Sequence, residues 1–147
     1  MFKRSLLILS ALALFGAGCF PVGNSPTPEA PPVDTSINGI IRGNWKMRTM
    51  KLGGGTTKEV SDLTLLVGFD GQNMNAKICN SMSGAYTVNN VVLKAPQVMS
   101  TKMFCEGDAG KAETAFTSGL ANGFEVMAAD NTITLTEGKT VLVFTRE

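Results

Sequence analysis

From Ile37 onward the chain carries apolar residues at mostly every second position, in short runs separated by turn residues. A period of two is typical of strands that bury one face and expose the other. Asn89-Asn90 and Asp130-Asn131 lie between such runs, and both pairs tolerate the positive φ of a tight hairpin turn. The pattern predicts about eight short strands. They are expected among nine candidate stretches: 40–52, 63–69, 74–78, 85–88, 91–94, 98–103, 124–128, 132–136 and 140–144.

Residues 109–120 have a helical period instead. Apolar side chains recur there at three and four residues and form a narrow stripe of Ala109, Ala112, Phe116 and Leu120. Asp108 either caps the start or favours the positive end of the helix dipole, and Asn122-Gly123 supplies a left-handed stop. Gly110 and Gly119 each cost up to about 1 kcal/mol in a helix interior, so the helix is expected to depend on packing against the sheet.

Hairpins with one inserted helix indicate an α+β fold that is mainly β. We expect one domain over residues 37–147, a strongly curved antiparallel sheet or open barrel of about eight short strands with the helix packed on it.

The first 18 residues are typical of a secretory signal peptide. A basic start containing Lys3 and Arg4 precedes an apolar run from Leu6 to Gly18, which is too short to span a bilayer core of about 30 Å. Small residues directly before Cys19 resemble the lipobox of bacterial lipoproteins, in which the cysteine is acylated. Ordinary secretion, with Cys19 an unmodified thiol, is the alternative.

Residues 19–36 are expected to be a lipidated cysteine followed by a disordered tether. Five of the six prolines fall here, with almost no large apolar side chain, so the segment cannot bury enough surface to fold. The residue after Cys19 is Phe20 rather than Asp, so nothing at this position indicates retention in an inner membrane. We therefore expect a membrane contact through the lipid anchor, on an outer membrane and facing the periplasm.

Charge balance and the absence of histidine exclude several classes of function. Removal of the signal peptide takes two of the 13 basic residues and leaves 11 against 12 acidic ones, a net charge of −1. Such a domain lacks the basic surface with which nucleic-acid-binding proteins meet phosphate. Without histidine the chain cannot use Ser-His-Asp or Cys-His catalysis or a histidine metal site.

Five short motifs occur in order along the predicted domain. They are Gly43-Asn44-Trp45, Cys79-Asn80, Gly84-Ala85-Tyr86, Thr101-x-Met103-x-Cys105 and Glu113-x-x-Phe116. In this order they resemble the META domain family, whose bacterial members include the HslJ-type heat-shock lipoproteins. Two residues depart from that family's pattern: Ile78 stands where Gly is usual, and Phe104 where a small residue is usual.

The resemblance implies a helix laid across a strongly curved sheet, near the barrel of lipocalin-like proteins. It also implies a role in the cell envelope tied to stress or antibiotic tolerance, and it implies no known reaction.

Cys79 and Cys105 are the pair that remains once Cys19 is lipidated. In an oxidising envelope an even pair suggests a disulfide, and two buried thiols are the alternative. Two thiolates without histidine fall short of a zinc tetrahedron, so we expect no metal and no cofactor. No spacing of carboxylates singles out an acid–base pair, and no catalytic residue is assigned.

Trp45 and five methionines are expected to fill the core. The spacing of the methionines follows strand alternation, although an adaptable apolar surface or a copper(I) site is the alternative. These methionines are Met74, Met82, Met99, Met103 and Met127.

Three hypotheses about function follow. The first is a non-enzymatic envelope lipoprotein that binds another envelope component, most simply a protein. The second is a carrier or pilot lipoprotein that holds a lipid tail or hydrophobic peptide in a groove of the barrel. A core filled by Phe69, Phe116, Leu135 and Phe144 would count against it. The third, an enzyme, needs a polar cleft that the sequence does not indicate.

Overall fold

The computed structural model describes residues 35–147. The predicted signal peptide, Cys19 and most of the predicted tether lie outside the described residues. Within the described part, neither helix combines the length and the apolar character needed to cross a bilayer.

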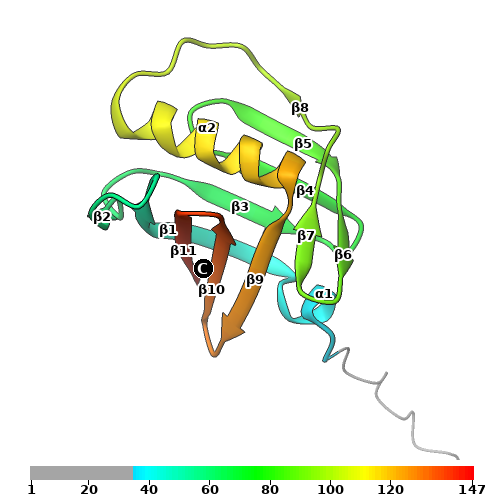
Figure 1. Ribbon diagram of the computed structural model, residues 1–147. Helices are drawn as coiled ribbons and strands as arrows, with labels where there is room; N and C mark the ends of the chain where they lie inside the picture. Colours follow the sequence, from blue (N-terminus) through cyan, green and yellow to red (C-terminus); the bar gives the residue numbers. More distant parts are fainter. Residues whose placement is uncertain (1–34) are drawn as a thin grey trace, which may run out of the picture. The chain divides into compact units, whose positions relative to one another are not determined.

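The described residues form a curled antiparallel half-barrel with one long helix against it (Figure 1). Ten strands follow one another in the order β6-β7-β9-β10-β11-β1-β3-β4-β5-β8, and β2 pairs with β1 outside this path. The predicted fold, mainly β with a helix on a strongly curved sheet, is confirmed. The elements are α1 (Ile37–Ile40), β1 (Gly43–Lys51), β2 (Lys58–Glu59), β3 (Leu66–Phe69), β4 (Asn73–Lys77), β5 (Ser81–Ala85), β6 (Thr87–Asn89), β7 (Val92–Lys94), β8 (Met99–Ser100), α2 (Gly107–Asn122), β9 (Phe124–Ala129), β10 (Thr132–Glu137) and β11 (Thr140–Arg146).

Tyr86 connects two strands that lie near opposite ends of the pairing order. β5 ends at Ala85 and β6 begins at Thr87, so a single residue separates them. β5 pairs with β4 and β8, whereas β6 pairs with β7. A strand that changes partners at a bend turns the corner of a sheet, and this one brings the two ends of the half-barrel together.

The described residues contain eleven strands rather than about eight. The sequence pattern missed β5 because that strand has one large apolar side chain, Met82, and pairs along its full length with β4. It also missed β2, which has two exposed residues. The stretch predicted over 98–103 is a strand only at Met99–Ser100.

The two predicted hairpin turns are confirmed. Asn90 has a φ of 55° between β6 and β7, and Asp130 has a φ of 50° between β9 and β10. Short polar side chains are the L-residues that adopt this left-handed backbone most readily.

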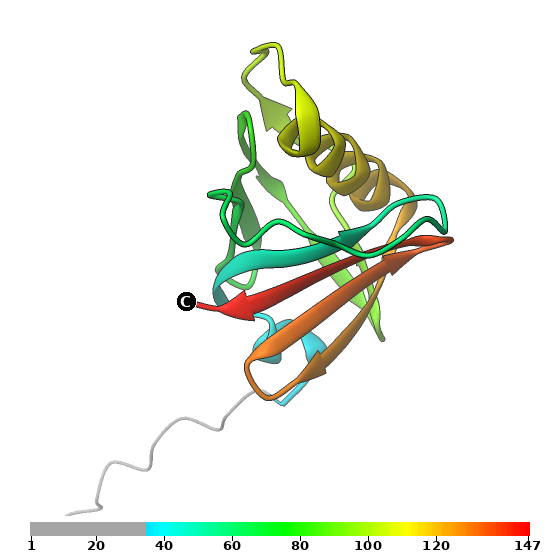
Figure 2. The same cartoon turned by 90° about the vertical axis from the view of Figure 1, so that its left-hand side faces the viewer.

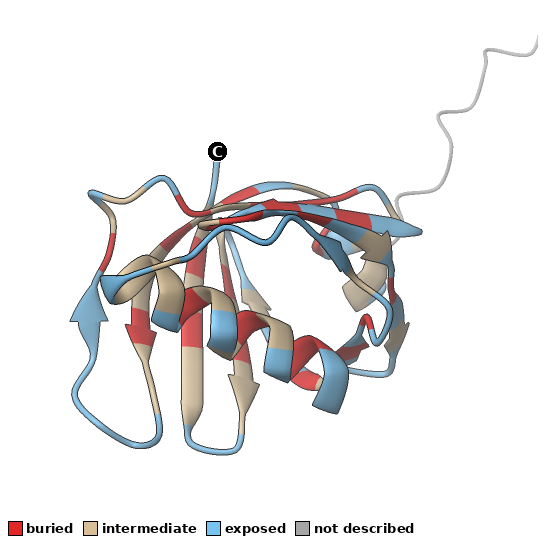
Figure 3. Ribbon diagram, turned by 90° about the horizontal axis from the view of Figure 1, so that it is seen from above, coloured by how far each residue is buried: buried red, intermediate tan, exposed pale blue. Residues whose placement is uncertain are grey.

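Helix α2 buries its predicted stripe against β7 and β10, and its buried residues are Ala112, Phe116, Gly119 and Leu120 (Figure 3). Glu106 is the N-cap residue and its side chain makes no capping bond. Of the two roles predicted for Asp108, capping is therefore wrong and a place at the positive end of the helix dipole is confirmed. Asp108 lies in the first turn, where its carboxylate suits the helix dipole and pairs with Lys58. Gly123 ends the helix at φ 113° and ψ 118°, so its positive φ is as predicted but its ψ lies outside the left-handed helical region.

Large side chains fill the inside of the half-barrel. Trp45, Phe116, Leu135 and Phe144 are all 0% exposed, and Phe69 is 4% exposed. The ring of Phe116 lies 6.2 Å from that of Phe144. The four side chains proposed above as a test of a filled core are thus all buried.

Candidate functional site

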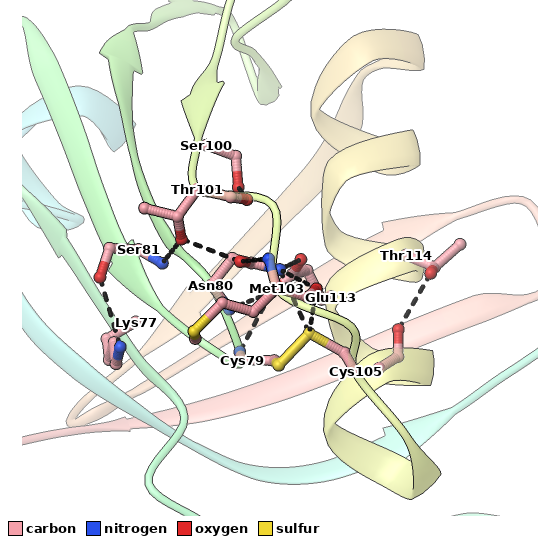
Figure 4. Close-up of a disulfide and its surroundings, with 11 residues drawn as sticks. Lys77, Cys79, Asn80, Ser81, Ser100, Thr101, Met103, Cys105, Glu113 and Thr114 are labelled. Atoms are coloured by element: carbon pink, nitrogen blue, oxygen red, sulfur yellow. Dashed lines mark hydrogen bonds between the residues drawn. A yellow bond between two sulfur atoms is a disulfide. The ribbon is translucent and has the colours of Figure 1, made fainter.

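A disulfide joins two segments at the end of the domain that lies away from α1. Cys79 lies in the turn between β4 and β5, and Cys105 lies in the connector between β8 and α2. Their sulfur atoms are 1.99 Å apart, so the predicted pair is bonded in the structure (Figure 4). Both cysteines are half-buried. The bond fixes the connector to the sheet 26 residues away along the chain.

The side chain of Asn80 takes the place of a strand partner for this connector. Its Oδ1 accepts hydrogen bonds from the backbone N–H of Met103 at 2.7 Å and from the hydroxyl of Thr101 at 2.8 Å. Its Nδ2 donates to the backbone carbonyl of Met103 at 3.2 Å. Asn80 is 4% exposed. A buried amide without hydrogen-bond partners would destabilise the fold, and these bonds remove that cost. The predicted strand stops before Met103 because the connector pairs with this side chain instead.

Glu113, in the second turn of α2, closes the same network. Its Oε2 accepts from the backbone N–H of Asn80 at 2.6 Å and of Cys79 at 3.0 Å, and its Oε1 accepts from Asn80 Nδ2 at 2.7 Å. One carboxylate therefore joins the helix to the β4–β5 turn through three N–H groups. The motif residues Cys79, Asn80, Thr101, Met103, Cys105 and Glu113 form one cluster, although they come from three segments of the chain.

With the disulfide formed, this cluster offers few groups that could react or bind a ligand. The sulfur atoms of Cys79 and Cys105 and a carboxylate oxygen of Glu113 lie within 4.8 Å of one another, a spacing that a metal ion could bridge. A metal binds thiolates, however, and both sulfurs are committed to the disulfide. The carboxylate accepts three hydrogen bonds. The arrangement therefore acts as a structural clamp.

Trp45 is the core anchor that the sequence predicted. Its indole N–H donates to the carbonyl of Ile41 at 2.7 Å. The guanidinium of Arg146 lies 4.3 Å from the ring centroid and donates to the carbonyls of Ile40 and Arg42. Arg146, which no sequence motif singled out, thus covers Trp45 and connects the last strand to α1.

Gly84 and Tyr86 also have structural roles. A Cβ at Gly84 would lie 2.6 Å from the carbonyl oxygen of Gln97, so no larger residue fits there without movement of the backbone. The hydroxyl of Tyr86 donates to Asn38 Oδ1 at 2.8 Å, and its ring lies edge-on to Phe69 at 5.1 Å. Burial raises the pKa of Tyr86 above its ordinary value of 10.0.

Asp70 organises the β3–β4 turn. Its Oδ1 accepts from the backbone N–H of Asn73 at 2.6 Å and of Gln72 at 2.8 Å. These two bonds, the one from Asn73 first, hold the pKa of Asp70 below its ordinary value of 3.8. A carboxylate bonded in this way stabilises a turn, and nothing in its geometry suggests acid–base chemistry.

The methionines divide between the core and the surface. Met74 and Met82 are buried, as predicted. Met99, Met103 and Met127 are 75%, 55% and 71% exposed, so core filling is wrong for these three. Alternation along a strand gives two faces but does not say which one is covered.

A surface hollow of about 610 Å³ lies between α2 and the chain at the ends of β1, β10 and β11. Its walls include Leu52, Lys111, Thr114, Ser118, Glu137 and Thr140. Gly107, Gly110 and Ala115 of α2 also line it. Apart from these small residues on the helix, no pattern in the sequence indicates the hollow.

Comparisons with known proteins agree with this architecture. The model of the META domain matches residues 38–147, which is three quarters of the chain and includes every described motif. None of the curated proteins compared with the chain matches it significantly.

Three solved structures have a similar fold. An NMR structure of a protein from Burkholderia xenovorans superposes with a TM-score of 0.58 at 20% identity, over 86% of this chain and 99% of that one. A second NMR structure gives a TM-score of 0.60 at 18% identity, over 72% and 90%. A crystal structure of a lipocalin-like protein from Bacteroides uniformis gives 0.53 at 16% identity, over 73% and 98%. At these identities the likeness concerns the fold alone.

Proposed function

The chain belongs to the META domain family, and we propose that it is a non-enzymatic lipoprotein of the cell envelope that binds another envelope protein. Cys19 carries the lipid anchor, and the domain faces the periplasm from the outer membrane. Its binding contributes to tolerance of stress or antibiotics, the role that the family resemblance implies.

The filled interior of the half-barrel is the observation that carries this proposal. The rings of Phe116 and Phe144 and the side chains of Trp45 and Leu135 are fully buried and occupy the space in which a lipocalin-like carrier would hold its ligand. A lipid tail could enter only if several of these side chains left the core. Binding at the outer surface is therefore favoured over the carrier or pilot function.

The hollow beside α2 is the surface that we assign to the partner. It combines an apolar wall at Leu52 with hydroxyls at Thr114 and Ser118, and it has one charge of each sign, at Lys111 and Glu137. Apolar contact with a few polar groups at the margin is the usual composition of a protein-binding surface. The clamp of Asn80, Glu113 and the disulfide holds the start of α2, and so one wall of the hollow, in place.

Site-specific crosslinking in living cells tests the partner. A photoreactive amino acid at Ser118, in the hollow, should give a discrete crosslinked protein, whereas the same group at Glu125, exposed on β9, should not. Ala115→Trp, which fills the hollow, should abolish the Ser118 product. Equal labelling at both positions, or a Ser118 product that survives Ala115→Trp, would contradict a partner in the hollow.

The anchor is tested separately. Cys19→Ser removes the thiol that is acylated, so this variant should lack the mass of the acyl chains that the wild-type protein carries in the membrane fraction. If the wild-type mature protein carries an unmodified Cys19, secretion without lipidation is correct instead.

A further inference from the structure

Three large apolar side chains project from one short stretch of chain at the far end of the domain. Met99 is 75% exposed, Met103 is 55% exposed and Phe104 is 88% exposed. Phe104 is the most exposed large apolar side chain among the described residues. We refer to these three residues together with Lys102 as the apolar tip.

The apolar tip is held outward by the clamp. Both backbone groups of Met103 bond to the side chain of Asn80, the backbone N–H of Thr101 donates to the carbonyl of Ser81, and Cys105 is fixed by the disulfide. The connector therefore cannot fold back to bury Phe104 on the domain's own surface. A rigid segment that exposes its apolar side chains loses little conformational freedom when a contact covers them.

The charges around the tip are suited to an anionic surface. Lys102 lies between the apolar residues and is exposed, and Lys77 is exposed nearby, with its ammonium against Ser81. The next acidic residue along the chain is Glu106, which is exposed at the start of α2. A lysine beside apolar side chains can place its ammonium among lipid headgroups while its neighbours enter the layer beneath.

The length of chain outside the described domain allows the tip to reach the membrane. Fifteen residues, 20–34, separate Cys19 from the described domain. At about 3.1 Å per residue they can span about 46 Å. A domain of this size is about 35 Å across. The tip lies at the end opposite α1, where the described chain begins (Figures 1 and 2), and the reach exceeds that distance.

We propose that the apolar tip is a second membrane contact. Met99, Met103 and Phe104 insert into the headgroup and upper acyl region of the bilayer that holds the Cys19 anchor, and Lys102 remains with anionic headgroups. This inference rests on the proposed lipid anchor but not on the proposed protein partner. One acyl anchor and one amphipathic contact together orient a domain that a tether alone leaves free to rotate.

Quenching by brominated lipids tests the contact. The lipidated full-length mature protein is placed in vesicles of phosphatidylethanolamine and phosphatidylglycerol, part of which carry bromine on the acyl chain. Trp45, the chain's one tryptophan, is 0% exposed and gives a constant background. Phe104→Trp should then show a blue-shifted emission that bromine quenches about twofold or more. Met127→Trp, at a position 71% exposed on β9, is the matched control and should not be quenched beyond the background.

A further substitution separates insertion from chance proximity. Lys102→Glu in the Phe104→Trp protein should reduce the quenching in anionic vesicles. Co-flotation of the protein with the vesicles reports the anchor independently, so failure of anchoring is visible as loss of flotation. If the protein floats with the vesicles and the Phe104→Trp variant is quenched no more than the Met127→Trp variant, the membrane contact is wrong.

Discussion

The carboxylate of Glu113 lies 2.6 Å from the backbone nitrogen of Asn80, and this bond links α2 to the β4–β5 turn across 33 residues of chain. The same carboxylate also accepts from Cys79 and from the Asn80 side chain. Hydrogen bonds to a charged acceptor are about twice as strong as neutral ones. Glu113 therefore contributes to the position of the helix as well as to its stability.

Glu113→Gln tests this contribution with almost no change in size. An amide supplies one acceptor oxygen, so its NH₂ group would face one of the three N–H donors that the carboxylate now satisfies. We expect the free energy of unfolding in urea to fall by about 1–3 kcal/mol. Glu125→Gln, which removes the same charge from an exposed position on β9, is the control and should change stability by less than about 0.5 kcal/mol. Equal effects at both positions would argue against the clamp.

The disulfide should stabilise the domain by restricting the unfolded chain. For a sequence separation of 26 residues, the chain-entropy model gives about 3.5 kcal/mol. Reduction of the wild-type protein should lower its unfolding free energy by about that amount and leave its far-ultraviolet circular dichroism unchanged, because the Asn80 and Glu113 bonds do not need the sulfur bond. The control is the double variant Cys79→Ser and Cys105→Ser, which should not respond to reductant. A reduced wild-type protein as stable as the oxidised one would show that the bond adds nothing.

The sequence predicted those parts of the fold that are encoded locally. The helix stripe and the Asn90 and Asp130 turns depend on residues a few positions apart, and the structure has all of them. β5 was missed because its strand form comes from pairing with β4 rather than from its own side chains.

The clamp was predictable only in part. The sequence motifs indicated Cys79, Asn80, Thr101, Cys105 and Glu113. The hydrogen bond between Asn80 and Met103, however, joins positions 23 residues apart and depends on the completed fold. The exposure of Met99 and Met127 was not predictable either, because the side of a strand that is covered is decided by distant elements, and Met103 is exposed in a connector that the sequence pattern assigned to a strand. The hollow beside α2 is likewise formed by residues that no local pattern connects.

Gly119→Ala should destabilise the domain, against the usual preference for alanine in helices. Alanine gains up to about 1 kcal/mol over glycine in a helix interior. A Cβ at position 119, however, would lie 2.0 Å from Cζ of Phe124, a side chain that is 0% exposed and cannot move freely. Overpacking of this kind costs about 1–3 kcal/mol, so we expect a net loss in the midpoint of urea unfolding.

Two variants test whether contact with Phe124 causes the destabilisation expected for Gly119→Ala. Ser118→Ala, on the exposed side of the same helix, should be neutral or slightly stabilising. In the background of Phe124→Leu, which shortens the ring that blocks the new methyl group, Gly119→Ala should cost less than it does in the wild type. If the substitution costs the same in both backgrounds, contact with Phe124 is not the reason for the glycine.

Tyr86 should make the stability of the domain sensitive to alkaline pH. It is the chain's one tyrosine, so ultraviolet absorbance reports its ionisation without interference from other phenols. Burial raises its pKa above 10.0, which means that the folded protein keeps the phenolic proton to a higher pH than the unfolded chain does. The associated stabilisation is complete below pH 10 and is lost as pH rises through the folded-state pKa. The absorbance midpoint of the folded protein should therefore lie above that of the protein in denaturant, and thermal stability should fall as pH rises above 10. Tyr86→Phe should cost about 1 kcal/mol at neutral pH through loss of the bond to Asn38, and it should weaken the alkaline fall in stability. Identical midpoints for the folded and denatured protein would mean that the phenol is solvated rather than buried.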